Sequence, residues 1–150
     1  MGVQLVLVVL GCMVALVTPI NYDDCGGNGF VVNSVDVQGC SDDSTCRIPV
    51  GETRTVTVRS VNEVTGFSSL QSKAYIILMG HSWELPVTPN DVCLHWGCPL
   101  SDYSTRTYSA NVHFNDTLLR RPGQLMLTVK YVTGEDEKVA FCVRFPVDLQ

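Results

Sequence analysis

The sequence predicts an all-β protein, an immunoglobulin-like antiparallel β-sandwich of about seven strands with three disulfides. Two observations lead to this fold class. Short runs of alternating apolar and polar residues recur between turn-rich segments, with no helical periodicity and no internal repeat. An apolar leader followed by six cysteines is typical of an exported domain held by disulfides.

The chain begins with an apolar run over residues 3–17. This run is shorter than the roughly 20 residues of a membrane span and suits the core of a secretory signal peptide. We expect residues 1–18 to be that signal peptide, with cleavage between Ala15 and Ile20, and residues 19–150 to form one domain. A bacterial lipoprotein box around Cys12 is the alternative, and it lacks the usual basic flank.

The cysteines beyond the leader predict a disulfide pairing. Cys40 with Cys46 and Cys93 with Cys98 each enclose a short loop, which leaves Cys25 to join Cys142. Zinc binding is the competing use of such spacings, but an oxidising compartment argues against it. We therefore expect no metal site and no cofactor.

Turn residues mark the first part of the domain. Residues 22–29 are polar and glycine-rich, so we expect an irregular lead-in. The first predicted strand carries Val31, Val35 and Val37 on one face and ends at Gly39. Residues 41–45 form the loop of the first close cysteine pair, and residues 48–51 predict a short strand and turn.

Three further strands follow in the middle of the chain. Residues 53–61 form a β-branched run in which Val56 and Val58 face inward. A turn region around Gly66 precedes an apolar strand over residues 74–79. Residues 105–114 predict another strand.

The last two strands, residues 125–132 and 139–147, have the clearest alternation and are joined by a polar hairpin loop. The apolar positions predicted to share the inner face are Leu125, Leu127, Val129 and Tyr131 in the first, and Val139, Phe141, Val143, Phe145 and Val147 in the second.

The stretch from Lys73 to Pro99 carries too much apolar surface for an ordinary water-facing loop. Its prolines lack the N–H that the interior of a sheet requires. We interpret it as one lip of an apolar pocket, with the segment Leu85-Pro86-Val87 at its centre. Trp83 and Trp96 each have two interpretations, a contact at the opening of the pocket or packing in the domain.

The composition argues against several functions. A net charge of −5 and the lack of a basic stripe argue against binding to nucleic acid or to anionic lipid headgroups. No G-x-S-x-G turn is present, and we do not expect an enzyme. His81, His95 and His113 suggest a pH sensor, but scattered histidines are more often plain surface residues. Asn115-Asp116-Thr117 is an N-glycosylation sequon.

The cysteine frame and its flanking residues resemble the lipid-recognition (ML) domain family over the whole mature chain. The similarity is nearest to the branch of soluble Niemann-Pick type C sterol carriers and their arthropod relatives. The motifs that carry it are Asp24-Cys25-Gly26, Val35-Asp36-Val37, Ser72-Lys73-Ala74, Leu85-Pro86-Val87, Cys98-Pro99, Thr107-Tyr108-Ser109 and Phe141-Cys142.

The resemblance implies that two sheets splay around an apolar ligand, and it implies the disulfide pairing already expected from spacing. Tyr131 and Val143 stand where the sterol carriers have tryptophan, and Leu85 stands where they have phenylalanine. Residues 111–122 align with them only across a gap. By position, and with the two residues that follow Leu85, the predicted pocket lining is Val37, Ile48, Val56, Leu85, Pro86, Val87, Leu127, Val129, Tyr131, Val143 and Phe145.

These observations predict a secreted or lysosomal carrier that binds a sterol, fatty acid or similar lipid and transfers it between membranes or proteins. We expect a monomer that makes transient contact with a membrane or membrane protein. The alternatives are an innate-immune lipid-recognition or chemical-signal-binding protein, and an adhesive sandwich whose apolar residues simply fill a core. The pocket hypothesis predicts that Leu85→Asp weakens lipid binding and leaves the fold intact.

Overall fold

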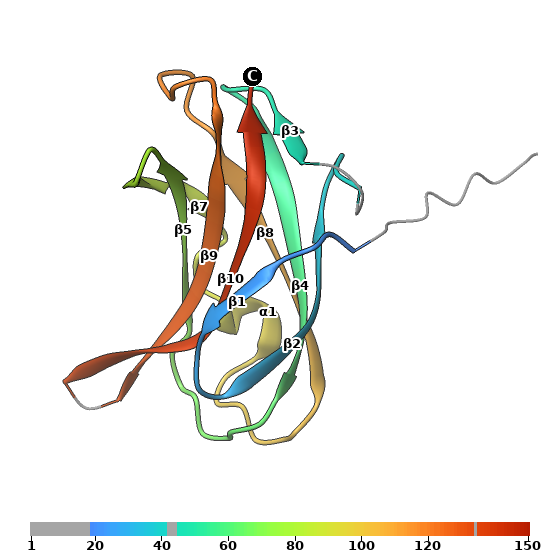
Figure 1. Cartoon of the computed structure of the whole chain (residues 1–150). Helices are drawn as coiled ribbons and strands as arrows, with labels where there is room; N and C mark the ends of the chain where they lie inside the picture. Colours follow the sequence, from blue (N-terminus) through green and yellow to red (C-terminus); the bar gives the residue numbers. More distant parts are fainter. Residues whose placement is uncertain (1–18, 42–44, 134) are drawn as a thin grey trace, which may run out of the picture.

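The computed structural model describes residues 19–41, 45–133 and 135–150, and it confirms a β-sandwich of two packed sheets (Figure 1). The predicted signal peptide, Cys12 and residues 42–44 lie outside the described residues. In the described part, ten strands and one short helix, α1 (Cys93–Trp96), form the domain, against about seven strands predicted.

The first sheet has the order β1 (Asp23–Gly26), β10 (Asp136–Leu149), β9 (Pro122–Thr133), β5 (Gln71–Leu78) and β6 (His81–Leu85). A short strand, β3 (Cys46–Ile48), pairs in parallel with the end of β10. The second sheet has the order β2 (Phe30–Val37), β4 (Thr53–Asn62), β8 (Thr105–His113) and β7 (Val87–Thr88). Apart from the β3–β10 pair, neighbouring strands are antiparallel.

The expected irregular lead-in is wrong in part, because Asp23–Gly26 forms strand β1 on the edge of β10. Glycine is needed directly after it. Gly27 passes so close to β10 that a Cβ there would lie 2.6 Å from the carbonyl oxygen of Ala140. This close approach explains a glycine-rich sequence in a segment that nevertheless pairs with a sheet.

Two β-bulges change which residues face the core. The ladder between β2 and β4 slips between Val32 and Ser34, so Val31 is 46 % exposed and does not share the buried face of Val35. The β9–β10 ladder slips between Val139 and Phe141. The predictions that Val31 and Val139 lie on the inner faces are therefore wrong, since each extra residue reverses the side-chain alternation.

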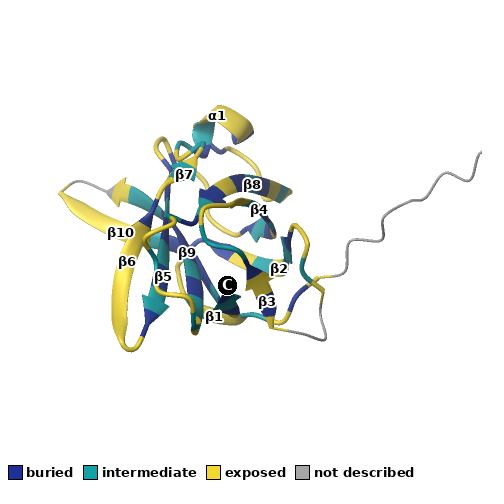
Figure 2. Cartoon of the chain, turned by 90° about the horizontal axis from the view of Figure 1, so that it is seen from above, coloured by how far each residue is buried: buried dark blue, intermediate teal, exposed yellow. Residues whose placement is uncertain are grey.

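The remaining alternating positions fill the space between the sheets. Val56 and Val58 of β4 are fully buried, as are Leu125, Leu127 and Val129 of β9. Figure 2 shows the buried residues gathered between the sheets and the exposed strand β6 at the margin of the molecule. The core is thus built by the strands whose period-2 pattern was clearest.

The six cysteines of the domain form the expected pairs. Cys25–Cys142 ties β1 to β10 within the first sheet. Cys40–Cys46 connects the end of β2 to β3, and therefore joins one sheet to the other. Cys93–Cys98 closes the turn that contains α1.

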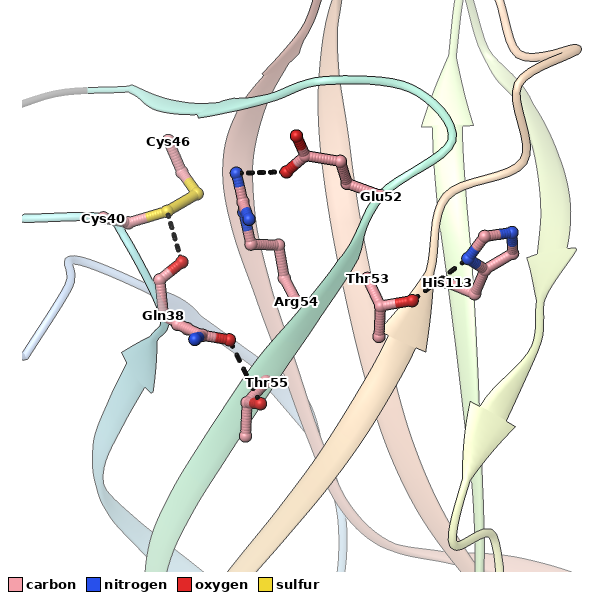
Figure 3. A network of polar contacts seen from close by, with 8 residues as sticks. All are labelled: Gln38, Cys40, Cys46, Glu52, Thr53, Arg54, Thr55 and His113. Carbon is pink, nitrogen blue, oxygen red and sulfur yellow. Dashed lines mark hydrogen bonds and ion pairs between the residues drawn. A yellow bond between two sulfur atoms is a disulfide. The ribbon is translucent and has the colours of Figure 1, made fainter.

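Polar contacts fix the start of β4 against its neighbours (Figure 3). The hydroxyl of Thr53 lies 3.1 Å from Nδ1 of His113 on β8, and Thr55 donates to the side chain of Gln38 at 3.3 Å. Arg54 forms an ion pair with Glu52 at 2.7 Å. These contacts hold the end of the sandwich at which the β8–β9 connection begins.

Candidate functional site

The segment Leu85-Pro86-Val87 is the point at which the chain crosses between the sheets. Leu85 ends β6 opposite Ala74, and Val87 begins β7 opposite Val112. The carbonyl oxygen of Pro86 accepts a hydrogen bond of 3.0 Å from the N–H of His113. The predicted lip is therefore a covalent link between two edge strands, one from each sheet.

Next to this crossing, an aromatic side chain on the inner face of the first sheet is exposed to solvent. Trp83 on β6 pairs with Ile76 on β5, so the two side chains lie on the same side of the sheet. Ile76 is fully buried, whereas Trp83 is 41 % exposed. The sandwich is consequently open along β6, at the edge where the chain segment after β8 covers it incompletely.

A cavity of about 230 Å³ lies at this open edge. We call it the edge cavity. Leu78 and Trp83 border it from the β5–β6 hairpin, and Leu118 and Leu119 border it from the β8–β9 connection. Its other lining residues are Glu84, Asn115 and Thr117.

The rim of the edge cavity carries exposed apolar side chains and charges of both signs, since Glu84 lines the cavity and Asp116 is exposed in the sequon. Met79, at the β5–β6 turn, is 70 % exposed, and Leu119 is 55 % exposed. The guanidinium group of Arg121 contacts the sulfur atom of Met79, which brings the hairpin turn and the β8–β9 connection together. Arg120 is exposed beside them.

The structure places most of the predicted lining residues in one buried cluster between the sheets. Tyr131 and Val87 are half-buried and pack against this cluster, and Pro86 is exposed. That any of these residues contacts a ligand stays a prediction. The fully buried members are Val37, Ile48, Val56, Leu85, Leu127, Val129, Val143 and Phe145.

The outer side of the Leu85-Pro86-Val87 crossing carries polar as well as apolar residues. A groove of about 380 Å³ runs beside it, lined by the crossing together with Gln71, Ser72, Lys73, Glu84, Asn90 and Glu137. The edge cavity lies one step along β6, at Trp83.

The two tryptophans have different roles in the fold. Trp96 is only 9 % exposed, and its indole N–H donates to the carbonyl oxygen of Thr107 at 2.9 Å. Its ring packs against Phe30 and Tyr108. Trp96 is therefore a packing residue, and Trp83 is the tryptophan that borders an opening.

Sequence reasoning missed part of the edge cavity. It named Trp83 and the sequon at Asn115 separately, and it did not single out Leu118 or Leu119. The available signal was the apolar pair Leu118-Leu119, which stands between the sequon and two arginines in a segment with no strand periodicity. Because no predicted strand turns these two leucines toward the core, their apolar character pointed to another role.

A hydrogen-bonded pair of buried hydroxyl groups lies between the sheets away from the edge cavity. The hydroxyl of Tyr108 donates to the carbonyl oxygen of Pro89 at 2.7 Å and also contacts the hydroxyl of Ser72. Burial raises the pKa of Tyr108, and the hydrogen bond with Ser72 opposes that shift. This pair fixes the segment after β7 and does not reach the edge cavity.

The three histidines occupy separate elements. His81, on β6, lies near Trp83. His95, on α1, lies near Tyr108 of β8, and His113, at the end of β8, contacts Thr53. The described residues contain no cluster of histidine, cysteine, aspartate or glutamate suited to holding a metal ion. None of the helical structure described is both long and apolar enough to cross a membrane.

Comparisons with known proteins add the following. The family model of the ML domain matches residues 19–149 of this chain. A search of curated proteins found no match.

Several solved structures share the fold, including the following two. A Niemann-Pick type C2 protein from the Japanese carpenter ant is similar with a TM-score of 0.71 and 17 % identity, over 87 % of this chain and 100 % of that one. The C-terminal domain of wzt is similar with a TM-score of 0.57 and 11 % identity, over 86 % of this chain and 78 % of that one. At these identities the likeness is one of fold.

Proposed function

The chain belongs to the ML-domain family, and from this membership we propose that it is a secreted or lysosomal carrier that holds a lipid between its two sheets. The ligand is a sterol, a fatty acid or a similar hydrophobic molecule. The proposal is one of binding and transfer, without catalysis. The edge cavity is the place where the ligand enters.

The observation that carries this proposal is the position of Trp83. It faces inward, yet it is 41 % exposed and borders a cavity. Leu78 borders the same cavity and is a fully buried member of the core cluster. A ligand seated in the edge cavity therefore touches the core directly.

The size of the edge cavity indicates how binding proceeds. Ligand pockets usually have volumes of about 300–1,000 Å³, which exceeds the volume of this cavity. A bound lipid must therefore move core side chains such as Leu125 and Ile76 apart and take their place between the sheets. Since the displaced contacts and the new ones are both apolar, no buried polar group loses a partner.

The driving force is apolar burial. Removing about 400 Å² of ligand surface from water contributes roughly 10 kcal/mol before the costs of association. That suffices for useful affinity without specific hydrogen bonds. Selectivity among lipids then follows from the shape of the space between the sheets.

The rim of the edge cavity supports transient contact with a membrane. Met79 and Leu119 are exposed, and Arg120 and Arg121 provide positive charge beside them. Glu84 lines the cavity, Asp116 is exposed in the sequon and the whole chain has a net charge of −5, so the exposed apolar side chains, and not net positive charge, favour this contact. A carrier held in this way delivers its lipid without releasing it into water.

Organic extraction of the protein purified from a eukaryotic host, followed by lipid mass spectrometry, tests the proposal. We expect one hydrophobic ligand per chain and reversible exchange with a fluorescent sterol or fatty acid. An extract without lipid, from protein that also fails to bind both probes, contradicts the carrier function and favours a sandwich with a filled core.

A further inference from the structure

We propose that an N-linked glycan on Asn115 covers the edge cavity and slows the passage of lipid through it. This inference rests on the proposed function, because it takes the edge cavity as the entrance. It assigns to the sequon a position in the lipid pathway. A glycan that only increases solubility, its ordinary role, could be attached anywhere on the surface.

The sequon lies in the wall of the edge cavity. Asn115 and Thr117 both line the cavity, opposite Trp83 on β6. Asn115 is half-buried, and Asp116 between the two is exposed. A sugar attached to the side-chain nitrogen of Asn115 therefore begins at the opening itself.

The attachment point is held in place by backbone hydrogen bonds. The N–H of Phe114, the residue before it, donates to the carbonyl oxygen of Glu52 at 2.9 Å. The N–H of Leu118 donates to the carbonyl oxygen of Asn115 at 3.1 Å, which forms the turn that carries Leu118 and Leu119. A glycan on this turn has a fixed base on one side of the opening.

The chemistry of the opposite side suits a sugar ring. Trp83 presents its ring partly exposed, and the C–H face of the first N-acetylglucosamine provides an apolar partner for it. Leu119 adds a further exposed apolar side chain beside the sequon. Covering these side chains removes an exposed apolar patch that otherwise invites non-specific association.

The test compares glycosylated and unglycosylated protein of the same fold. Wild type and Thr117→Ala are produced in a glycosylating eukaryotic host, and intact mass establishes whether Asn115 carries a glycan. Part of the wild type is deglycosylated with a peptide-N-glycosidase, which leaves Thr117 unchanged and converts Asn115 to aspartate. Asp116→Ala serves as the control because it retains the sequon and alters an exposed residue outside the cavity lining.

The rate of uptake of dehydroergosterol and of a fluorescent fatty acid from phosphatidylcholine vesicles is the readout. We expect Thr117→Ala and the deglycosylated wild type to take up the probes several-fold faster than the glycosylated wild type. Asp116→Ala should take them up as slowly as the glycosylated wild type. In a Trp96→Phe background, acrylamide should quench Trp83 fluorescence less in the glycosylated form.

Equal uptake rates and equal quenching with and without the glycan overturn the inference, as does wild-type protein without a sugar on Asn115. Failure of every form, including the deglycosylated one, to take up either probe overturns the proposed carrier function. The two failures are thus distinguishable by whether unglycosylated protein binds lipid.

Discussion

Trp83 and Ile76 stand directly opposite each other in the β5–β6 ladder, but only Ile76 is covered by the second sheet. The same side of one sheet therefore changes from core to open surface within a single cross-strand pair. This boundary is where we expect a lipid to enter, and it separates residues that determine stability from residues that determine binding.

Trp83→Ala should weaken lipid binding about tenfold, equivalent to about 1.4 kcal/mol, because it removes the apolar surface at the opening. It should lower the free energy of unfolding by no more than about 1 kcal/mol, since the side chain is partly exposed. Titration with a fluorescent fatty acid and urea unfolding measure the two effects. Unchanged affinity would remove Trp83 from the binding site.

Trp96→Ala is the matched comparison and should have the opposite outcome. The buried indole packs against Phe30 and donates a hydrogen bond to Thr107, so its loss should cost about 3–5 kcal/mol of stability. Urea unfolding monitored by far-ultraviolet circular dichroism measures this cost. A loss below about 1 kcal/mol would show that the packing around α1 contributes little.

Leu85→Asp should unfold the domain instead of leaving the fold intact as the sequence suggested. Leu85 is 3 % exposed and packs in the core, where an unpaired carboxylate is strongly unfavourable. Leu85→Ala, which adds no charge, should cost about 2–5 kcal/mol. Circular dichroism at 25 °C separates the two variants, and a folded Leu85→Asp would place Leu85 at a solvated opening after all.

Stability should fall at alkaline pH because burial raises the pKa of Tyr108. The folded state holds this proton more tightly, so the contribution is complete below the ordinary tyrosine pKa of about 10 and is lost as pH rises above it. Tyr108→Phe should flatten this dependence in urea titrations at several pH values. Tyr22→Phe is the control. Burial also raises the pKa of Tyr22, but that side chain is half-buried, so Tyr22→Phe should change the pH dependence less than Tyr108→Phe does. An unchanged alkaline slope in Tyr108→Phe would contradict the assignment.

Removing Cys25–Cys142 should destabilise the domain more than removing Cys93–Cys98. The first bridge spans 117 residues and the second spans 5, and the loop-closure model assigns them about 5 and about 2 kcal/mol. Paired serine variants, compared by thermal unfolding, measure the difference. Equal losses would indicate that local packing, and not the unfolded chain, sets the contribution of each bridge.

The long strands could be predicted because their alternation is strong and is dictated by burial. Val56 and Val58, for example, are fully buried as their pattern indicates. The bulges in β2 and β10 could not be predicted, since one inserted residue changes the pairing without leaving a mark in composition. The misplaced faces of Val31 and Val139 have this single cause.

The edge strands and the candidate site were harder for a related reason. The sequence HSWEL of β6 is too short for its alternation to identify a strand, and its strand conformation comes from pairing with β5. Periodicity places Leu127 between the sheets but does not indicate whether it contacts a neighbour or a ligand. Only the arrangement in space brings Trp83 to the leucines of the β8–β9 connection.

The two sheets are joined differently along their two long edges. On the β2–β3 side the Cys40–Cys46 disulfide closes the connection, whereas on the β6–β7 side the described residues are linked covalently by the backbone through Pro86 alone. Local opening in the native state should therefore be more frequent on the β6–β7 side. The amide protons of β6 should exchange with solvent deuterium faster than those of β2 and β3. A domain that opens locally along one edge can admit a long molecule while most of its backbone hydrogen bonds remain formed.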